Sequence, residues 1–150
     1  MALEEWKSSL EQAILVKLAE IDQNRTLKLL DVGVFPWHTS IELSAFYVGD
    51  DSEDAFEDDI ASWPNYNFSH QEDGQWPEVE DLCEAMATEY SEAGDMSDSS
   101  EESTIAAMYF QAAADVMKRP AIAETLNTKH LADGFRIMVL DPDDPDTDYM

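Results

Sequence analysis

The chain has 150 residues, of which 34 are Asp or Glu and only 8 are Lys or Arg, so its formal net charge is −26. With 44% apolar and 10% aromatic residues it can bury a core, which excludes a wholly disordered protein. So few basic side chains exclude a direct nucleic-acid binder, and no apolar run approaches the roughly 18–20 residues of a membrane span.

The N-terminal sequence and the cysteine content predict a cytoplasmic protein. MALEEWKSSLEQ has neither the basic region nor the apolar region of a signal peptide. Cys83 is the single cysteine, so no intrachain disulfide can form and a reducing compartment is expected.

The spacing of apolar residues predicts an α+β domain with a small, mostly antiparallel sheet of three to four strands packed against about four helices. Residues 1–140 are expected to form a single domain, and 141–150 a flexible acidic tail with two prolines. In chain order we expect a helix over 3–21, an antiparallel hairpin of strands 29–35 and 41–48, an edge strand over 63–68, helices over 77–93, 100–119 and 121–133, and a last strand over 135–140.

The acidic residues are concentrated in the middle of the chain. No Lys or Arg occurs between Lys28 and Lys118, so local ion pairs cannot neutralise this stretch. Residues 49–59, GDDSEDAFEDD, form its most acidic segment and are predicted to be a loop. Such a charge distribution steers cationic partners and raises association rates by about 10–10³-fold. Solubility, or adaptation to high salt, is the alternative explanation.

Aromatic residues lie in or beside the turns around this segment: Trp37, Trp63, Tyr66 and Trp76. Trp and Tyr among carboxylates are typical of a protein interface, where they act as buried anchors or as cation–π partners. Packing of the same rings at strand ends explains them equally well. The predicted binding residues are Asp50, Asp51, Glu53, Asp54, Glu57, Asp58, Asp59, Trp37, Trp63 and Trp76.

Neither a metal nor a cofactor is expected. The acidic runs do not fit the spacing of an EF-hand calcium loop. His38, His70 and His130 are far apart in sequence, so no short-range zinc pair exists. Cys83 lies on the apolar stripe of its predicted helix, which favours a buried structural thiol over a nucleophile.

Two carboxylates of the predicted hairpin indicate an alternative function. Asp31 and Glu42 alternate with apolar neighbours, so both point away from the core and can meet on the exposed face of the sheet. A pair of like charges there would raise one pKa and create an acid–base site for a small hydrolase. A solvated sheet face is the simpler interpretation.

Residues 31–44, DVGVFPWHTSIELS, resemble a segment of uncharacterised small acidic bacterial proteins of the immunity-protein type. This resemblance, carried by FPWHTSIELS, implies a binding role. The sequence therefore predicts a non-enzymatic acidic protein that captures a basic protein partner, either a toxin or a nucleic-acid-binding protein. An immunity protein that neutralises a nuclease-type toxin with a nucleic-acid-mimicking surface is the most specific form, and a hydrolase or a generic acidic structural domain are the alternatives.

Overall fold

The computed structural model describes residues 1–70, 73–95 and 99–150, and it confirms the α+β class. The described residues form four α-helices: α1 (Leu3–Leu18), α2 (Glu80–Asp95), α3 (Ser99–Met117) and α4 (Pro120–Leu126). The strands are β1 (Leu27–Phe35), β2 (Ser40–Tyr47), β3 (Leu131–Met138), β4 (Leu140–Asp141) and β5 (Asp144–Asp148). Short 3₁₀ turns lie at Pro36–His38, Ile60–Ser62 and Pro77–Val79.

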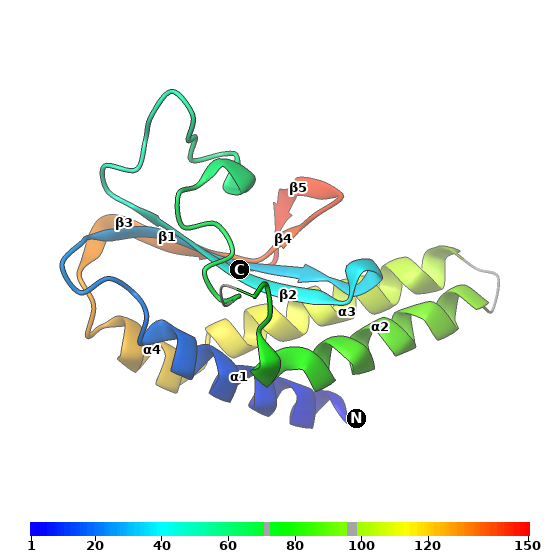
Figure 1. The fold of residues 1–150 in the computed structure, drawn as a ribbon. Helices are drawn as coiled ribbons and strands as arrows, with labels where there is room; N and C mark the ends of the chain where they lie inside the picture. Colours follow the sequence, from blue (N-terminus) through cyan, green and yellow to red (C-terminus); the bar gives the residue numbers. More distant parts are fainter. Residues whose placement is uncertain (71–72, 96–98) are drawn as a thin grey trace.

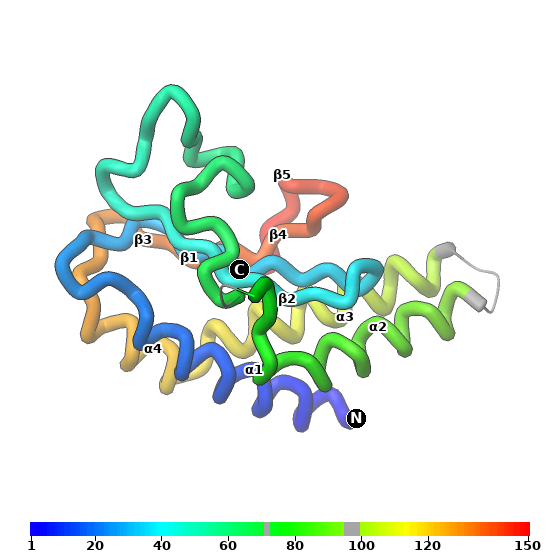
Figure 2. Tube along the Cα trace, in the orientation of Figure 1, coloured from blue at the N-terminus to red at the C-terminus, as the bar shows by residue number. Residues whose placement is uncertain are grey.

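The main sheet has three strands in the order β2-β1-β3. β1 and β2 form the predicted antiparallel hairpin, and β3 runs parallel to β1, so the three-stranded sheet is mixed. The four helices lie on one side of this sheet (Figure 1). Residues 48–70, which we call the covering segment, cross the other side together with the β4–β5 hairpin (Figure 2).

The main core lies between the sheet and the helices. Alternate residues of the hairpin, such as Val32 and Leu43, point toward this layer and are fully buried. Trp6 of α1 connects the helices, because its indole Nε1 donates a hydrogen bond to the Leu82 carbonyl at 3.1 Å. Its ring also packs edge-on against Tyr109 of α3, with centroids 4.9 Å apart.

A smaller apolar cluster lies on the opposite face of the sheet. Leu29, Phe46 and Met138 point toward it from the three strands, and Trp63 of the covering segment packs on Phe46 with ring centroids 5.3 Å apart. The segment is also bonded to β2, because the Leu43 amide donates to the buried Ser69 Oγ at 2.9 Å. The second face of the sheet is therefore covered in large part by protein.

Two predicted elements differ from the structure. Residues 63–68 form no strand; a single bridge joins Asn65 to Ala45, and Asn67 has a positive φ of 52°, which interrupts an extended conformation. The helix predicted over 121–133 ends at Leu126, because the chain turns and His130 accepts a hydrogen bond from the Leu27 amide at 2.8 Å. This long-range contact starts the pairing of β3 with β1.

The residues beyond 140, predicted to form a flexible tail, contain the strand β5 paired with β4. Tyr149 then returns to the main core, where its ring lies 5.5 Å from that of Phe110. The Tyr149 amide also donates to the Val139 carbonyl at 2.9 Å. These contacts fix the hairpin above the second face of the sheet.

Candidate functional site

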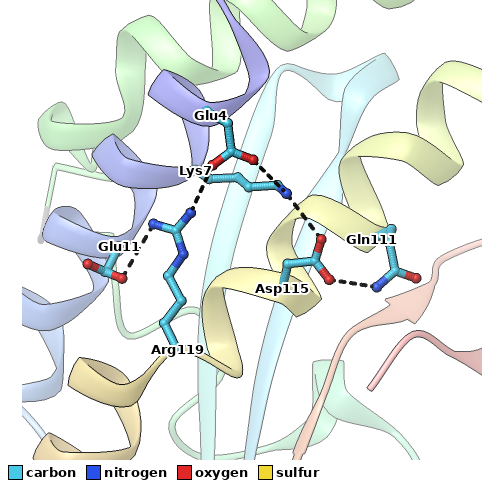
Figure 3. A network of polar contacts seen from close by, with 6 residues as sticks. All are labelled: Glu4, Lys7, Glu11, Gln111, Asp115 and Arg119. Carbon is cyan, nitrogen blue, oxygen red and sulfur yellow. Dashed lines mark hydrogen bonds and ion pairs between the residues drawn. The ribbon is translucent and has the colours of Figure 1, made fainter.

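Ion pairs on the helical layer occupy several of the few basic side chains (Figure 3). Lys7 of α1 contacts Asp115 of α3 at 3.1 Å and Glu4 at 3.2 Å. Arg119 contacts Glu4 and Glu11 of α1 at 3.4 and 3.5 Å. This network connects α1 to α3 and to the residue that precedes α4, so its cations are not available to the acids above the sheet.

Lys17 contacts Glu20 at 3.0 Å at the end of α1, and two further ion pairs use single acids near the sheet. Arg25 contacts Asp50 at 2.6 Å, and Lys28 forms an ion pair with Glu57. Among the residues that the structure describes, the other predicted acids of the loop take part in no ion pair: Asp51, Glu53, Asp54, Asp58 and Asp59. All five are exposed. Among the described residues, direct ion pairs therefore compensate this loop at Asp50 and Glu57 only.

Asp50 was predicted as a surface ligand, and the structure assigns it a structural role. Its side chain is buried, with one carboxylate oxygen bound to Arg25 and the other accepting a hydrogen bond from the Tyr47 amide at 2.8 Å. Asp50 therefore fixes the point at which the chain leaves β2, and a partner cannot reach it without breaking these bonds.

Internal hydrogen bonds order the acidic loop, which comprises residues 49–59. The amide of Phe56 donates to Ser62 Oγ at 2.8 Å, and its carbonyl accepts from Trp63 Nε1 at 3.0 Å. The backbone amide and carbonyl groups of Ser52 and Ala55 also bond to each other. The ring of Phe56 nevertheless remains 52% exposed, so the loop presents one apolar side chain among its carboxylates.

The three predicted tryptophan anchors lie mainly inside the protein. Trp63 and Trp76 are each 3% exposed, so neither can contact a partner in this structure. Trp37 is half-buried, with ring centroids 6.0 Å from Tyr90 and 6.4 Å from Phe110. Packing, the alternative that the sequence left open, explains these rings. Phe56 was not singled out, although it is the single aromatic residue of GDDSEDAFEDD.

A pocket of about 360 Å³ lies on the second face of the sheet, which we call the carboxylate pocket. Its acidic lining comes from four elements or segments: Asp31 of β1, Glu42 of β2, Asp58 and Asp59 of the acidic loop, and Asp141 of β4. Its remaining walls are Tyr66, Gly33 and apolar side chains including Phe35, Ile60, Leu140, Pro142 and Pro145. The predicted loop acids Asp58 and Asp59 thus meet the predicted hairpin pair in one place.

The register of the hairpin explains how Asp31 and Glu42 reach one pocket. Asp31 pairs with Ser44 and Gly33 pairs with Glu42, so the two acids lie diagonally across the ladder on the same face. Gly33 leaves the space between them open. A Cβ at this position would lie 2.8 Å from the Phe35 ring and 3.7 Å from Asp31 Oδ2.

Asp31 is buried, contrary to the prediction of an exposed sheet face. The prediction was correct that its side chain points away from the helical core, but the covering segment and the β4–β5 hairpin leave it little access to solvent. The side chain is 6% exposed and has no hydrogen-bond or ion-pair partner among the described residues. Burial, followed by the charges of Asp148 and Glu42, raises the pKa of Asp31 to about 8.

Glu42 is half-buried and already has hydrogen-bond donors. The Tyr66 hydroxyl donates to its Oε2 at 3.1 Å, and the Ser40 hydroxyl donates to Oε1 at 3.4 Å. Burial and the nearby charge of Glu42 raise the pKa of Tyr66, so this phenol keeps its proton and remains a donor. The two carboxyl groups thus have different environments within one pocket.

Cysteine chemistry is poorly supported. Cys83 and His70 line a second cavity, of about 400 Å³, at the start of α2. Burial raises the pKa of the Cys83 thiol to about 11 and lowers the pKa of His70. Both shifts oppose the thiolate and the imidazolium that a nucleophilic cysteine requires. Within residues 1–70, 73–95 and 99–150, no group of three or more acidic, His or Cys side chains is arranged to hold a metal ion.

Comparison with protein-family models, with curated proteins and with solved structures finds no match. The resemblance of residues 35–44 to immunity-type proteins therefore stays a prediction. Among the described helices, none combines the length and the apolar character needed to cross a lipid bilayer.

Proposed function

We propose that this protein is a non-enzymatic binding protein that captures a basic protein partner through its acidic loop. One observation carries the proposal: a loop with its own hydrogen bonds presents both the exposed Phe56 and exposed carboxylates that have no ion-pair partner among the described residues. Carboxylates that were present for solubility alone would need neither the apolar residue nor the ordered backbone.

The charges and the ring contribute to different stages of binding. Uncompensated acids such as Glu53 and Asp54 attract a positive surface over a Debye length, which is about 10 Å at 0.1 M salt. Phe56 supplies the apolar contact that slows dissociation once water is excluded around it. Because the loop is ordered by Ser62 and Trp63, binding does not cost the entropy of ordering it.

The partner that fits this surface is a protein that itself binds nucleic acid. Such proteins carry clusters of Lys and Arg, which contact phosphates spaced along a backbone. The loop carboxylates offer these side chains a comparable row of anionic oxygens. A nuclease-type toxin is the most specific candidate, and in that case the protein would block the active cleft as an immunity protein does.

Affinity capture tests the proposal with matched charge reversals. We compare the wild type with the double variant Glu53→Lys/Asp54→Lys, in which the acidic loop is altered. The control is Glu5→Lys/Glu124→Lys, which makes the same change of charge on exposed positions of α1 and α4, on the other side of the sheet. Capture from a lysate of the native cells is carried out at about 0.1 M and 1 M salt, where the Debye length falls from about 10 to 3 Å.

We expect one basic protein to be retained at the lower salt by the wild type and by the control, and to be lost by the loop variant. Purified partner and stopped-flow mixing should then show that the loop variant reduces the association rate by about 10-fold or more. Equal retention by the loop variant and the control would contradict the proposal, as would the absence of any specific partner at both salt concentrations.

Hydrolysis by the Asp31–Glu42 pair is a second candidate, favoured because both carboxyl groups line one pocket. An acid–base site also requires groups that bind the substrate. Apart from the Asp31 carboxyl group itself, the single side-chain donor in the described lining is the Tyr66 hydroxyl, which already bonds to Glu42. A panel of chromogenic esters and glycosides would decide the question: turnover by the wild type that Asp31→Asn abolishes would support the hydrolase.

A further inference from the structure

The unexplained feature of the carboxylate pocket is Asp31. A buried carboxyl group usually has a hydrogen-bond or charge partner, because removing it from water without one costs several kcal/mol. Asp31 has none among the described residues, although it is 94% buried by solvent accessibility, and it lines the open volume of the pocket. A partner for this group is therefore expected to enter from outside.

The lining specifies the chemistry of that partner. Four other carboxyl groups face the same volume, and among the residues that the structure describes no Lys, Arg, His, Asn or Gln side chain lines it. The side chains thus accept hydrogen bonds and offer almost no donors. A ligand that only donates, such as an ammonium or a guanidinium, matches this lining, whereas an anion or a sugar does not.

The size and the walls of the pocket fit a basic group carried on an apolar stem. A volume of about 360 Å³ lies near the lower end of ligand pockets, which hold about 300–1,000 Å³. Ile60, Leu140 and Pro142 form apolar walls against which methylene groups can pack. Inorganic cations gain nothing from such walls, which favours an organic cation.

The position of the pocket connects it to the acidic loop. Asp58 and Asp59 belong both to that loop and to the pocket lining, so the two features are continuous. A basic protein attracted by the loop would therefore place its side chains at the entrance. We propose that the carboxylate pocket binds the alkylammonium or guanidinium group of a Lys or Arg side chain of the basic partner, with Asp31 as its buried counter-ion. This inference rests on the proposed function for the source of the cation.

Proton release accompanies such binding. The groups that face Asp31 are Glu42 of β2, Asp148 of β5, Asp141 of β4, and Asp58, Asp59 and Tyr66 of the covering segment, while Met138 of β3 carries no charge. None is cationic, so Asp31 retains its proton at neutral pH. An entering cation stabilises the carboxylate, and the proton is transferred to the buffer.

Isothermal titration calorimetry tests the inference with small probes on the whole protein. The probes are N-acetyl-lysine amide, N-acetyl-arginine amide and 1,4-diaminobutane, and N-acetyl-norleucine amide is the uncharged control. Each is titrated at low ionic strength into the wild type, into Asp31→Asn and into Glu124→Gln, which removes one exposed acid from α4. Two buffers of different ionisation enthalpy report the number of protons released.

We expect the cationic probes to bind the wild type and Glu124→Gln, and to bind Asp31→Asn at least about tenfold more weakly. Binding to the wild type should release about one proton at pH 7, and binding to Asp31→Asn none. Tighter binding of the capped amino acids than of the diamine supports a protein side chain as the source. The opposite order supports the organic cation but overturns the protein source in favour of a free polyamine.

Equal binding of the norleucine control, equal affinity of Asp31→Asn, or no proton release would each overturn the inference. Its failure is separable from failure of the proposed function. If Glu53→Lys/Asp54→Lys loses the captured partner while Asp31→Asn binds all probes like the wild type, the pocket inference is wrong and the acidic loop still captures the partner.

Discussion

Replacing Asp31 by Asn should stabilise the protein at neutral pH. Asn has nearly the shape of a protonated Asp, carries no charge and can donate to the carboxylates around it. Folding raises the pKa of Asp31 from 3.8 to about 8, mainly because the group is removed from water. The folded protein therefore binds this proton more tightly than the unfolded chain does.

The sign and the size of the effect follow from proton linkage. For a carboxyl group whose pKa is raised by folding, the stabilising contribution is complete below the unfolded pKa of 3.8, and it is lost as the pH rises to about 8. Each pKa unit corresponds to about 1.4 kcal/mol, so the loss between 3.8 and pH 7 is on the order of 4 kcal/mol. Asp31→Asn does not titrate and avoids this loss.

Urea unfolding between about pH 5 and 9, followed by tryptophan fluorescence, measures the difference. The free energy of unfolding of Asp31→Asn minus that of the wild type should grow by about 1.4 kcal/mol per pH unit and become constant above the folded pKa. General charge repulsion affects both proteins and cancels, and Glu124→Gln controls for removal of one surface charge. A difference that does not change with pH, or a destabilised Asp31→Asn at pH 7, would refute the burial argument.

Three further substitutions separate structural from binding roles. Asp50→Ala should lower the free energy of unfolding by about 2–3 kcal/mol in urea titrations, because it leaves the Tyr47 amide unpaired. A change below about 0.5 kcal/mol would contradict the structural role of Asp50 and favour the predicted role as a surface ligand. Trp63→Ala should cost about 3–5 kcal/mol by the same assay, since the buried indole packs on Phe46, and a small cost would show that it is not buried. Phe56→Ala should change stability by less than about 0.5 kcal/mol but should increase the dissociation rate of the captured partner, measured by surface plasmon resonance. An unchanged dissociation rate would show that Phe56 does not contribute to the interface.

Local patterns predicted the elements whose contacts are local. The stripe of Trp6, Leu10 and Ile14 indicated α1, and the alternation on either side of Pro36 indicated the antiparallel hairpin. The sequence predicted a last strand over 135–140 but neither its start at Leu131 nor its parallel pairing with β1, because that pairing depends on a bond between residues 27 and 130 that no local pattern contains. The apolar residues of 121–133 have the spacing of a helix, but the hydrogen bond between residues 27 and 130 ends the helix at Leu126.

In the candidate site, too, local sequence predicted some properties of single side chains, while others depend on long-range packing. Alternation placed Asp31 and Glu42 on one face of the hairpin, and the structure confirms that they share a face. Their exposure depended on what lies above that face, namely the covering segment and the β4–β5 hairpin, and neither was predicted to pack there. Periodicity therefore gave the direction of each carboxyl group but not its solvation.

The solvation of these acids gives them different uses. A carboxylate in water, such as Asp54, costs little and acts at long range, which suits attraction of a partner. A buried and unpartnered acid such as Asp31 destabilises the fold by several kcal/mol at neutral pH, and a cation that reaches it recovers that energy on binding. Binding of the proposed cation would thus convert stability that is lost in the free protein into affinity, which would be a reason for a strongly acidic protein to bury a carboxyl group such as Asp31 without a partner.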